Sequence, residues 1–221
     1  MVEPSGHQAA AAIHEIAHPA AVTVSLFFAQ LRQAAPIARS VIEIFEPVSE
    51  RGQAGIEELQ KQTVNLLSFK PLVKDIFDAQ VSFNMLSGYG SDAPRSLEDI
   101  ELRIDRHLAS LLALTHAAPM PSLRLIQAPV FHGYSLSAWV EFESRPELPA
   151  IVQALESNKI IDVRTAEHER PTNVGVAGQG GITVGSMAPD RNHPRAAWFW
   201  IVADNLHLTA ENALEVAREF L

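Results

Sequence analysis

The sequence predicts a fold of the α+β class, with a mixed, largely antiparallel sheet that is covered by helices on one side. Two observations lead to this prediction. Apolar and polar residues alternate in short runs, such as residues 136–142, and this alternation is typical of half-buried strands. The helical stretches do not alternate regularly with the strands, so a parallel sheet built from βαβ units is not expected. From these patterns we expect about six strands and about five helices.

Helices are predicted where apolar residues recur every three or four positions. The clearest helix begins after Ser96, a residue type that is well suited to cap a helix N-terminus. Ile100, Ile104 and Leu108 follow at helical spacing and would face the core. Four of the predicted helices cover residues 22–34, 52–63, 96–114 and 146–157.

Two of the predicted strands, residues 123–130 and 136–143, are expected to be antiparallel neighbours. Pro129 cannot donate to a ladder and Gly133 allows a tight turn, so the connection between the strands is expected to bend there. Such a bend predicts a functional site, because it directs several polar side chains out of the sheet together. These side chains are Gln127, His132 and Tyr134. The other predicted strands are residues 38–48, 160–163, 182–184 and a last strand from 198.

Composition places the chain among globular proteins without a nucleic-acid or membrane partner. Its 221 residues are 47% hydrophobic and 19% charged, which suits one large domain or two small ones. The net charge of −9 argues against non-specific binding to nucleic acid, which requires a basic face. No apolar run reaches the ~18–20 residues of a membrane span, and Glu3 stands where a secretory signal would be basic. We therefore expect a cytoplasmic protein.

Thiol chemistry is excluded and metal chemistry has weak support. The chain has no cysteine, which removes disulfides, thiolate ligands and thiol nucleophiles and fits a reducing compartment. His14, Glu15 and His18 have the spacing of a helical zinc site in which the Glu acts as base. Pro19 follows His18 and disfavours a helical conformation there. A chance match in a strand or loop is the favoured interpretation, and a zinc hydrolase is the alternative.

Several stretches together resemble the aspartate-semialdehyde dehydrogenase family, including its Usg-like relatives. Residues 127–135 match the family pattern Arg-x-Pro-Val-x-x-Gly-His at its Pro, Val and Gly positions. Residues 52–63 follow Gly-x-x-Gly-x-x-Glu-Leu-x-x-Gln-Thr, and residues 200–206 follow Trp-x-Val-x-Asp-Asn-Leu. The resemblance covers residues 18–221, the catalytic and dimerisation half of the family, and leaves 1–17 as an N-terminal segment. It includes no dinucleotide-binding half.

The resemblance implies that the chemical groups of the family site have been replaced. Ala21 stands at the position of the nucleophilic Cys, and Glu46 at that of a Gln that orients the substrate. Gln127 replaces the Arg that binds the substrate carboxylate, and Tyr134 replaces the acid/base His. Asn205 is the corresponding cofactor-binding position. A carboxylate at Glu46 would repel an oxyanion, so the site is expected to be catalytically inactive.

One further pair of family residues lies on the predicted helix over 96–114. Family members carry a Glu and, three residues later, a Lys that help bind substrate and phosphate. The matching positions here are His107 and Ser110, or Asp105 and Leu108 after a shift of two residues. Neither register keeps both charges, so we interpret this side of the helix as a solvent-exposed face.

The favoured hypothesis is a non-catalytic, homodimeric structural or partner-binding module that holds no cofactor. The resemblance implies that one face of the sheet forms the dimer interface. Trp139, Phe142, Trp198 and Trp200 lie at strand spacing and suit such an interface or the core. The small-molecule ligand is unknown, and an aspartate-like ligand is not expected because Gln127 offers no positive charge.

The alternative hypothesis is an enzyme. On this interpretation the chain is a piece of an NADP-dependent semialdehyde dehydrogenase-like oxidoreductase of amino-acid biosynthesis, and its cofactor domain lies outside the sequence. Glu46, His132 and Tyr134 would then form a different acid/base set, since Tyr and Glu exchange protons when their pKa values are tuned.

Overall fold

The computed structural model describes residues 15–145 and 147–219, and within them it confirms the predicted fold class. One mixed sheet has the strand order β2-β1-β3-β6-β5-β4. The strands are β1 (Ile37–Glu46), β2 (Ser122–Gln127), β3 (Tyr134–Phe142), β4 (Ile161–Arg164), β5 (Ile182–Pro189) and β6 (Ala196–Ala203). The helices are α1 (Pro19–Ala34), α2 (Gly52–Leu67), α3 (Leu97–Thr115), α4 (Leu148–Glu156) and α5 (Asn205–Arg218), with 3-10 turns η1 (Val48–Arg51) and η2 (Glu167–Glu169).

The predicted pairing of the two strands beside the bend is wrong. β2 and β3 do run in opposite directions, but β1 lies between them, parallel to β2 and antiparallel to β3. The segment between β2 and β3 is therefore not a hairpin. It passes over the end of β1, where Val130 and Phe131 accept backbone hydrogen bonds from Val48 and Ser49. Pro129 lies in this crossing segment, beyond the last residue of β2.

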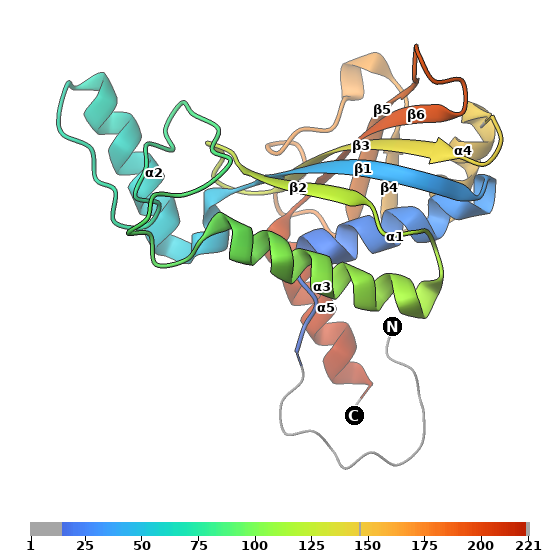
Figure 1. Cartoon of the computed structure of the whole chain (residues 1–221), viewed down its shortest axis with the longest axis horizontal. Coiled ribbons are helices and arrows are strands. Elements are labelled where there is room, and N and C mark those ends of the chain that lie inside the picture. The colour runs from blue at the N-terminus through green and yellow to red at the C-terminus, as the bar shows by residue number, and fades with distance from the viewer. Residues whose placement is uncertain (1–14, 146, 220–221) are drawn as a thin grey trace.

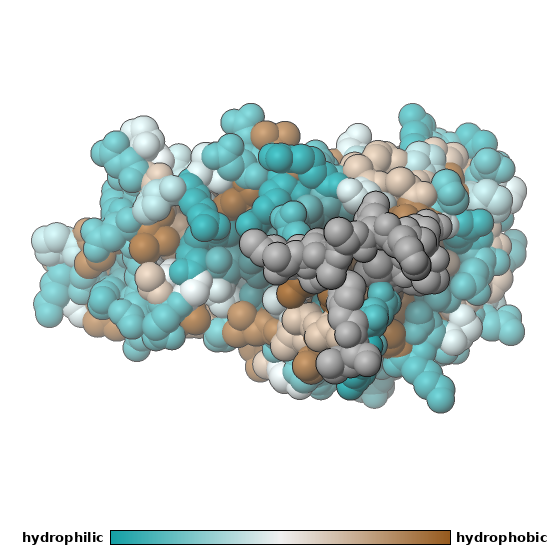
Figure 2. All heavy atoms as spheres, turned by 90° about the horizontal axis from the view of Figure 1, so that it is seen from below, coloured by the Kyte–Doolittle hydropathy of each residue, from teal (hydrophilic) through white to brown (hydrophobic). Residues whose placement is uncertain are grey.

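Helix α1 is the centre of the core. It contacts α3, α4, α5 and β1, and in Figure 1 it lies with α3 and α5 below the sheet. Phe27 is fully buried on α1 and contacts Phe199 of β6 edge-on, with ring centroids 5.1 Å apart. The prediction that helices cover one side of the sheet is confirmed. The outer surface on the helical side is mostly hydrophilic (Figure 2).

Helix α2 and the loop over 68–96 form an arm that projects beyond the end of the sheet (Figure 1). The arm has a small core of its own, formed by Val48, Leu59, Phe77 and Val81. Its loop is bonded to several side chains of α2, among which Gln62 makes the most hydrogen bonds. This buried amide donates to two loop carbonyls and accepts from two loop N–H groups.

The other face of the sheet carries no helix within the described residues. All three tryptophans of the chain lie on this face, which we call the open face. Trp139 and Trp198 are directly opposite each other in the register of β3 and β6, and Trp200 is two residues along β6. Phe142, for which the core was one of the two expected places, is fully buried there.

Candidate functional site

The structure brings together three of the four positions at which a family residue is replaced. Glu46 ends β1, Gln127 ends β2 and Tyr134 begins β3, so all three lie at the same end of the sheet. All three side chains are fully buried. Ala21 is also fully buried, in the N-terminal part of α1. The buried residue His18 caps this helix and lies beside Tyr134, with ring centroids 5.9 Å apart.

Glu46 has a charged partner that the sequence analysis did not predict. The Arg51 guanidinium donates a hydrogen bond to its carboxylate, and the Arg51 side chain is only 7% exposed. Burial raises the pKa of Glu46 to about 7, although Arg51 opposes part of this shift. Burial alone would lower the pKa of Arg51, but Glu46, Tyr89 and Tyr134 together more than offset that effect, so the pKa is raised. The predicted repulsion of an oxyanion by Glu46 is therefore countered by a cation that the resemblance did not supply.

Gln127 has a structural role that explains its complete burial. Its amide nitrogen donates to the backbone oxygens of Glu46, at 2.8 Å, and Ala128, at 3.0 Å. Its amide oxygen accepts from the Tyr89 hydroxyl at 2.5 Å. Every polar atom of the Gln127 side chain is thus occupied within the chain. Burial and the nearby Glu46 raise the pKa of Tyr89, so this hydroxyl stays protonated and remains a donor.

Asn205, the predicted former cofactor-binding position, joins three segments around the site. Its side-chain oxygen accepts from the backbone N–H of Gly133 at 3.0 Å, and its nitrogen donates to Glu50 at 2.8 Å and to Ser49 at 3.1 Å. Gly133 has φ +82°, which a residue with a side chain rarely adopts. Asn205 therefore fixes the bend between β2 and β3 against η1.

His132 is not part of this cluster. Its backbone oxygen accepts from Asn173, which also binds Gly133 and the Ser135 hydroxyl. The predicted grouping of Gln127, His132 and Tyr134 at the bend thus holds only for the first and the last.

In the structure, His18 and Glu15 of the predicted zinc pattern contact other groups of the protein. His14 lies outside the described residues. His18 accepts from the Ala20 N–H at 3.3 Å, and burial lowers its pKa to about 3. Glu15 is exposed and lies 3.2 Å from His107. Among residues 15–145 and 147–219, no group of three or more His, Cys, Asp or Glu is arranged to hold a metal ion.

The two registers proposed for α3 place different residues near the site. His107 accepts the backbone N–H of His18 at 2.8 Å, while Ser110 bonds back to Arg106 on its own helix. Leu108 is fully buried in the core. Burial raises the pKa of Asp105, and Glu101 adds to this effect. Only His107 therefore contacts the end of α1 that borders the site.

Sequence reasoning missed three residues of the cluster. No role was predicted for Arg51, and Tyr89 lies in a loop for which no element was predicted. Arg103 was taken as part of a solvent-exposed face, yet its Nε is buried and its charge acts on His18 and Glu46. The basic and aromatic residue types were visible, but only the fold shows that they converge.

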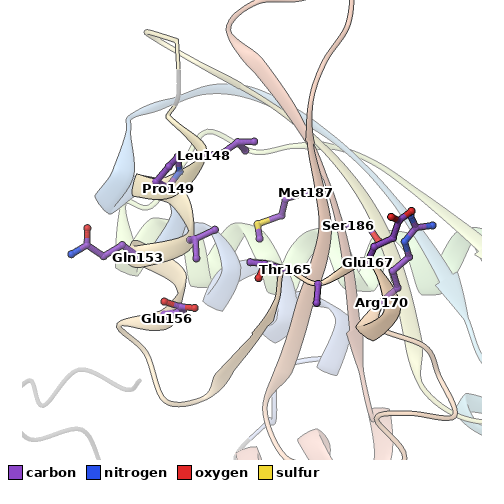
Figure 3. A pocket seen from close by; sticks show the side chains of 11 residues that line it. Leu148, Pro149, Gln153, Glu156, Thr165, Glu167, Arg170, Ser186 and Met187 are labelled. Carbon is purple, nitrogen blue, oxygen red and sulfur yellow. The ribbon is translucent and has the colours of Figure 1, made fainter.

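A separate hollow of about 580 Å³ lies between α4, the segment around η2 and β5 (Figure 3). Leu148 and Met187 give it an apolar wall, and the ion pair of Glu167 and Arg170, 2.7 Å apart, lies at its rim. It contains none of the predicted site residues.

None of the helices in the described part of the chain is long and apolar enough to cross a bilayer.

The open face carries its own polar network. Asp190 accepts the indole N–H groups of Trp139, at 2.9 Å, and Trp198, at 2.8 Å. Glu141 is 3% exposed and binds Arg39 of β1 and Arg195, which directly precedes β6. Trp198 is nevertheless 42% exposed. The face therefore carries neighbouring aromatic rings, a residue type enriched at protein interfaces, and polar groups that are paired within the chain.

Comparison with known proteins agrees with this geometry. A family model described as semialdehyde dehydrogenase, dimerisation domain, matches residues 28–208. The chain belongs to this family. The resemblance recognised in the sequence is therefore confirmed. The fold is that of a semialdehyde dehydrogenase dimerisation domain, whereas the replaced site residues and the boundary at residue 18 remain predictions.

The relatives of this dimerisation domain are longer proteins. A USG-1 protein homolog of Pseudomonas aeruginosa is 36% identical over 160 residues, which are 72% of this chain and 47% of that protein. An aspartate-semialdehyde dehydrogenase of Rickettsia bellii is 26% identical and covers 91% of this chain and 60% of its own.

A solved structure of a probable aspartate-semialdehyde dehydrogenase from Pseudomonas aeruginosa is 28% identical, with a TM-score of 0.80 over 93% of this chain and 62% of that one. Aspartate semialdehyde dehydrogenase II from Vibrio cholerae shares the fold at 23% identity, with the same TM-score. The chain thus spans only part of the length of each of these relatives.

Proposed function

We propose that this chain acts as a non-catalytic module that forms a homodimer through its open face. The observation that carries the proposal is that all three tryptophans gather on the open face of the sheet, which carries no helix in the described part of the chain. Large exposed aromatic groups with aligned polar partners are typical of interface centres. Membership in a dimerisation-domain family supports the same partner, a second copy of the chain.

The loss of catalysis is supported by the residues of the buried cluster. The chain contains no cysteine, so no thioester forms on it. Gln127 is bonded entirely within the chain, and Glu46 is paired with Arg51. Because these side chains are already bonded within the chain, they are not available to bind a substrate. The proposal assigns no cofactor to this chain.

Sedimentation of the purified chain and its variants tests the dimer. Trp198→Arg should weaken dimerisation at least about 30-fold, since truncating an interface hot spot costs ~2 kcal/mol or more. Leu102→Arg is the matched control, because Leu102 is 46% exposed on α3, on the opposite side of the sheet. Tryptophan emission should shift to the red on dilution of the wild type. A monomer at all concentrations, or equal effects of both variants, would contradict the proposal.

A second function is favoured by the length of the relatives. Aspartate-semialdehyde dehydrogenases are matched over about three fifths of their chains, at 60% and 62%. The alternative is therefore that the sequence belongs to an NADP-dependent oxidoreductase with a further domain. Immunoblotting of source cells distinguishes the two. A band near 24.2 kDa supports the separate module, and a band larger by ~100–150 residues supports the enzyme.

A further inference from the structure

The side chains of the open face form rows that run across the strands. β1, β3 and β6 lie side by side in the middle of the sheet (Figure 1). Because Val41 is opposite Trp139 and Trp139 is opposite Trp198, these three side chains form one row, which we call the central row. Val41 is 45% exposed and Trp198 is 42% exposed. The central row therefore exposes apolar surface across three neighbouring strands.

The row on one side of the central row carries an excess of positive charge. It contains Arg39 and Glu141, which are opposite each other in β1 and β3, and Arg195, which directly precedes β6. Both arginines bind the buried carboxylate of Glu141, and their side chains are 68% and 50% exposed. The Arg39 guanidinium also lies over the Trp139 ring, 5.8 Å from its centroid. One carboxylate does not neutralise two guanidinium groups, so this row has a net positive charge.

The row on the other side of the central row contains a carboxylate that is available to a partner. Glu43 lies two residues beyond Val41 on β1 and is exposed. Within the described part of the chain its side chain forms no hydrogen bond and no ion pair. Its neighbour on β2, Arg124, is instead directed to Glu101 of α3, at 3.8 Å. Glu43 therefore offers a negative charge on the same face as the positive row.

The order of these rows fits a symmetric pair of chains. In a two-fold dimer every contact occurs twice, because residue i contacts residue j and j contacts i. Rotation by 180° about a line along the central row keeps each strand opposite its own copy and exchanges the two outer rows. Arg39 then lies opposite Glu43 of the partner subunit. A two-fold axis parallel to the strands would instead set the two positive rows against each other, which is unfavourable.

We propose that Arg39 and Glu43 are the specificity-determining pair of the homodimer, with Arg39 of each copy bound to Glu43 of the partner subunit and the two-fold axis lying along the central row. This inference rests on the homodimer proposed above and adds the register and identity of its contacts. Burial of the tryptophans supplies attraction without direction. The charge pair decides which partner and which orientation are accepted, because a related sheet that lacks either charge leaves the other without a counter-ion.

Charge reversal tests the pair directly. Glu43→Arg brings two arginines together at each symmetric contact, and Arg39→Glu brings two carboxylates together there. Each variant alone should dimerise at least about tenfold more weakly than the wild type. An equimolar mixture of the two should form a heterodimer with near wild-type affinity, because every contact again joins opposite charges. Sedimentation with a fluorescent label on one variant measures both the separate variants and the mixture.

The matched control for these variants is Glu156→Arg. Glu156 is exposed at the end of α4, which packs against α1 on the helical side of the sheet. This substitution makes the same change in net charge as Glu43→Arg but lies away from the open face. It should therefore dimerise as the wild type does.

Ionic strength provides a readout that needs only one variant. The Debye length falls from ~10 Å at 0.1 M salt to ~3 Å at 1 M, so salt weakens both the attraction in the wild type and the repulsion in Glu43→Arg. The difference in affinity between these two proteins should shrink from at least about tenfold at ~0.1 M salt toward no difference at ~1 M. A difference that arises from altered packing would persist.

The chain has no cysteine, so a single introduced thiol can locate the axis. Packed sheets lie ~10 Å apart, and a thiol cross-linker of about that reach joins residues that face each other. Val41→Cys should cross-link to its own copy, because position 41 lies on the axis. Glu43→Cys is the control. Its two thiols are separated by four residues along the strand, ~13 Å, in addition to the gap between the sheets, so it should not cross-link.

The outcomes separate this inference from the proposed function. If the wild type dimerises and Trp198→Arg disrupts the dimer, but the mixed variants form no heterodimer, the Arg39–Glu43 pair is wrong and the homodimer stands. Cross-linking of Glu43→Cys without cross-linking of Val41→Cys would contradict the axis in the same way. A wild type that is monomeric at every concentration would overturn both proposals. If Arg39→Glu does not fold, Glu43→Arg with wild-type affinity at ~0.1 M salt overturns the pair by itself.

Discussion

The Glu46 carboxyl should make the protein less stable as the pH rises through neutrality. Its pKa is raised from 4.5 in the unfolded chain to about 7 in the folded one, mainly because the carboxyl is fully buried. Below pH 4.5 both states hold the proton and the group has no effect. Between these values the unfolded state releases its proton first, so the free energy of unfolding falls. Above pH 7 the loss is complete and constant.

The size of this effect follows from the shift. Each pKa unit corresponds to 1.36 kcal/mol, so a shift from 4.5 to about 7 amounts to about 3 kcal/mol. Glu46→Gln copies the shape of the protonated carboxyl and cannot ionise. The variant should therefore match the wild type near pH 4.5 and exceed it by about 3 kcal/mol at pH 8.

Urea unfolding followed by circular dichroism at pH 4.5, 6 and 8, at one fixed protein concentration, measures this difference. The control is Glu57→Gln, because Glu57 is exposed and its side chain contacts only Gln53 and Lys61, each four residues away on the surface of α2. That change should stay within ~0.5 kcal/mol at every pH. If the difference between Glu46→Gln and the wild type does not grow with pH, the carboxyl ionises normally in the folded protein and the reasoning fails.

Other side chains allow three further tests. Gln62→Ala should cost ~2–4 kcal/mol and raise hydrogen exchange in residues 68–96 but not in the sheet, because loop groups lose their partner. Asp204→Ala should cost ~1–2 kcal/mol in thermal unfolding, since Asp204 caps α5 and accepts from Gly178. Tyr134→Phe should stabilise the fold by ~1 kcal/mol, whereas Tyr89→Phe, which breaks the bond to Gln127, should destabilise it in the same urea assay.

Most elements of the fold were predictable because their patterns are local. The helix after Ser96 begins where expected, and the Ser96 hydroxyl accepts from Asp99 as a cap should. The partner of β2 was not predictable in the same way. Its ladder joins it to β1, about 80 residues away, so nothing next to it in the sequence reveals the pairing. Closeness in the chain favoured β3 instead.

The bend after residue 127 already indicated Gln127 and Tyr134 as candidate site residues, and the family resemblance extended the prediction. It pointed to Glu46, Gln127 and Tyr134, which the fold brings to one end of the sheet. It gave no reason to expect Arg51, because that residue belongs to a short turn whose burial is decided by tertiary packing. A sequence pattern shows which residues are replaced. The positive charge of Arg51, which compensates Glu46, lies outside that pattern and is found only from the three-dimensional structure.

The position of β1 in the sheet has a consequence for how the protein is made. This strand ends at residue 46, but its two neighbours are complete only at residues 127 and 142. At a synthesis rate of ~5–20 residues per second, β1 remains unpaired on the ribosome for on the order of 5–20 s. Its apolar residue Ile44, which later lies opposite Leu125 and Leu136, stays uncovered during that time. A nascent chain arrested before β3 is therefore the form of this protein that most needs a chaperone.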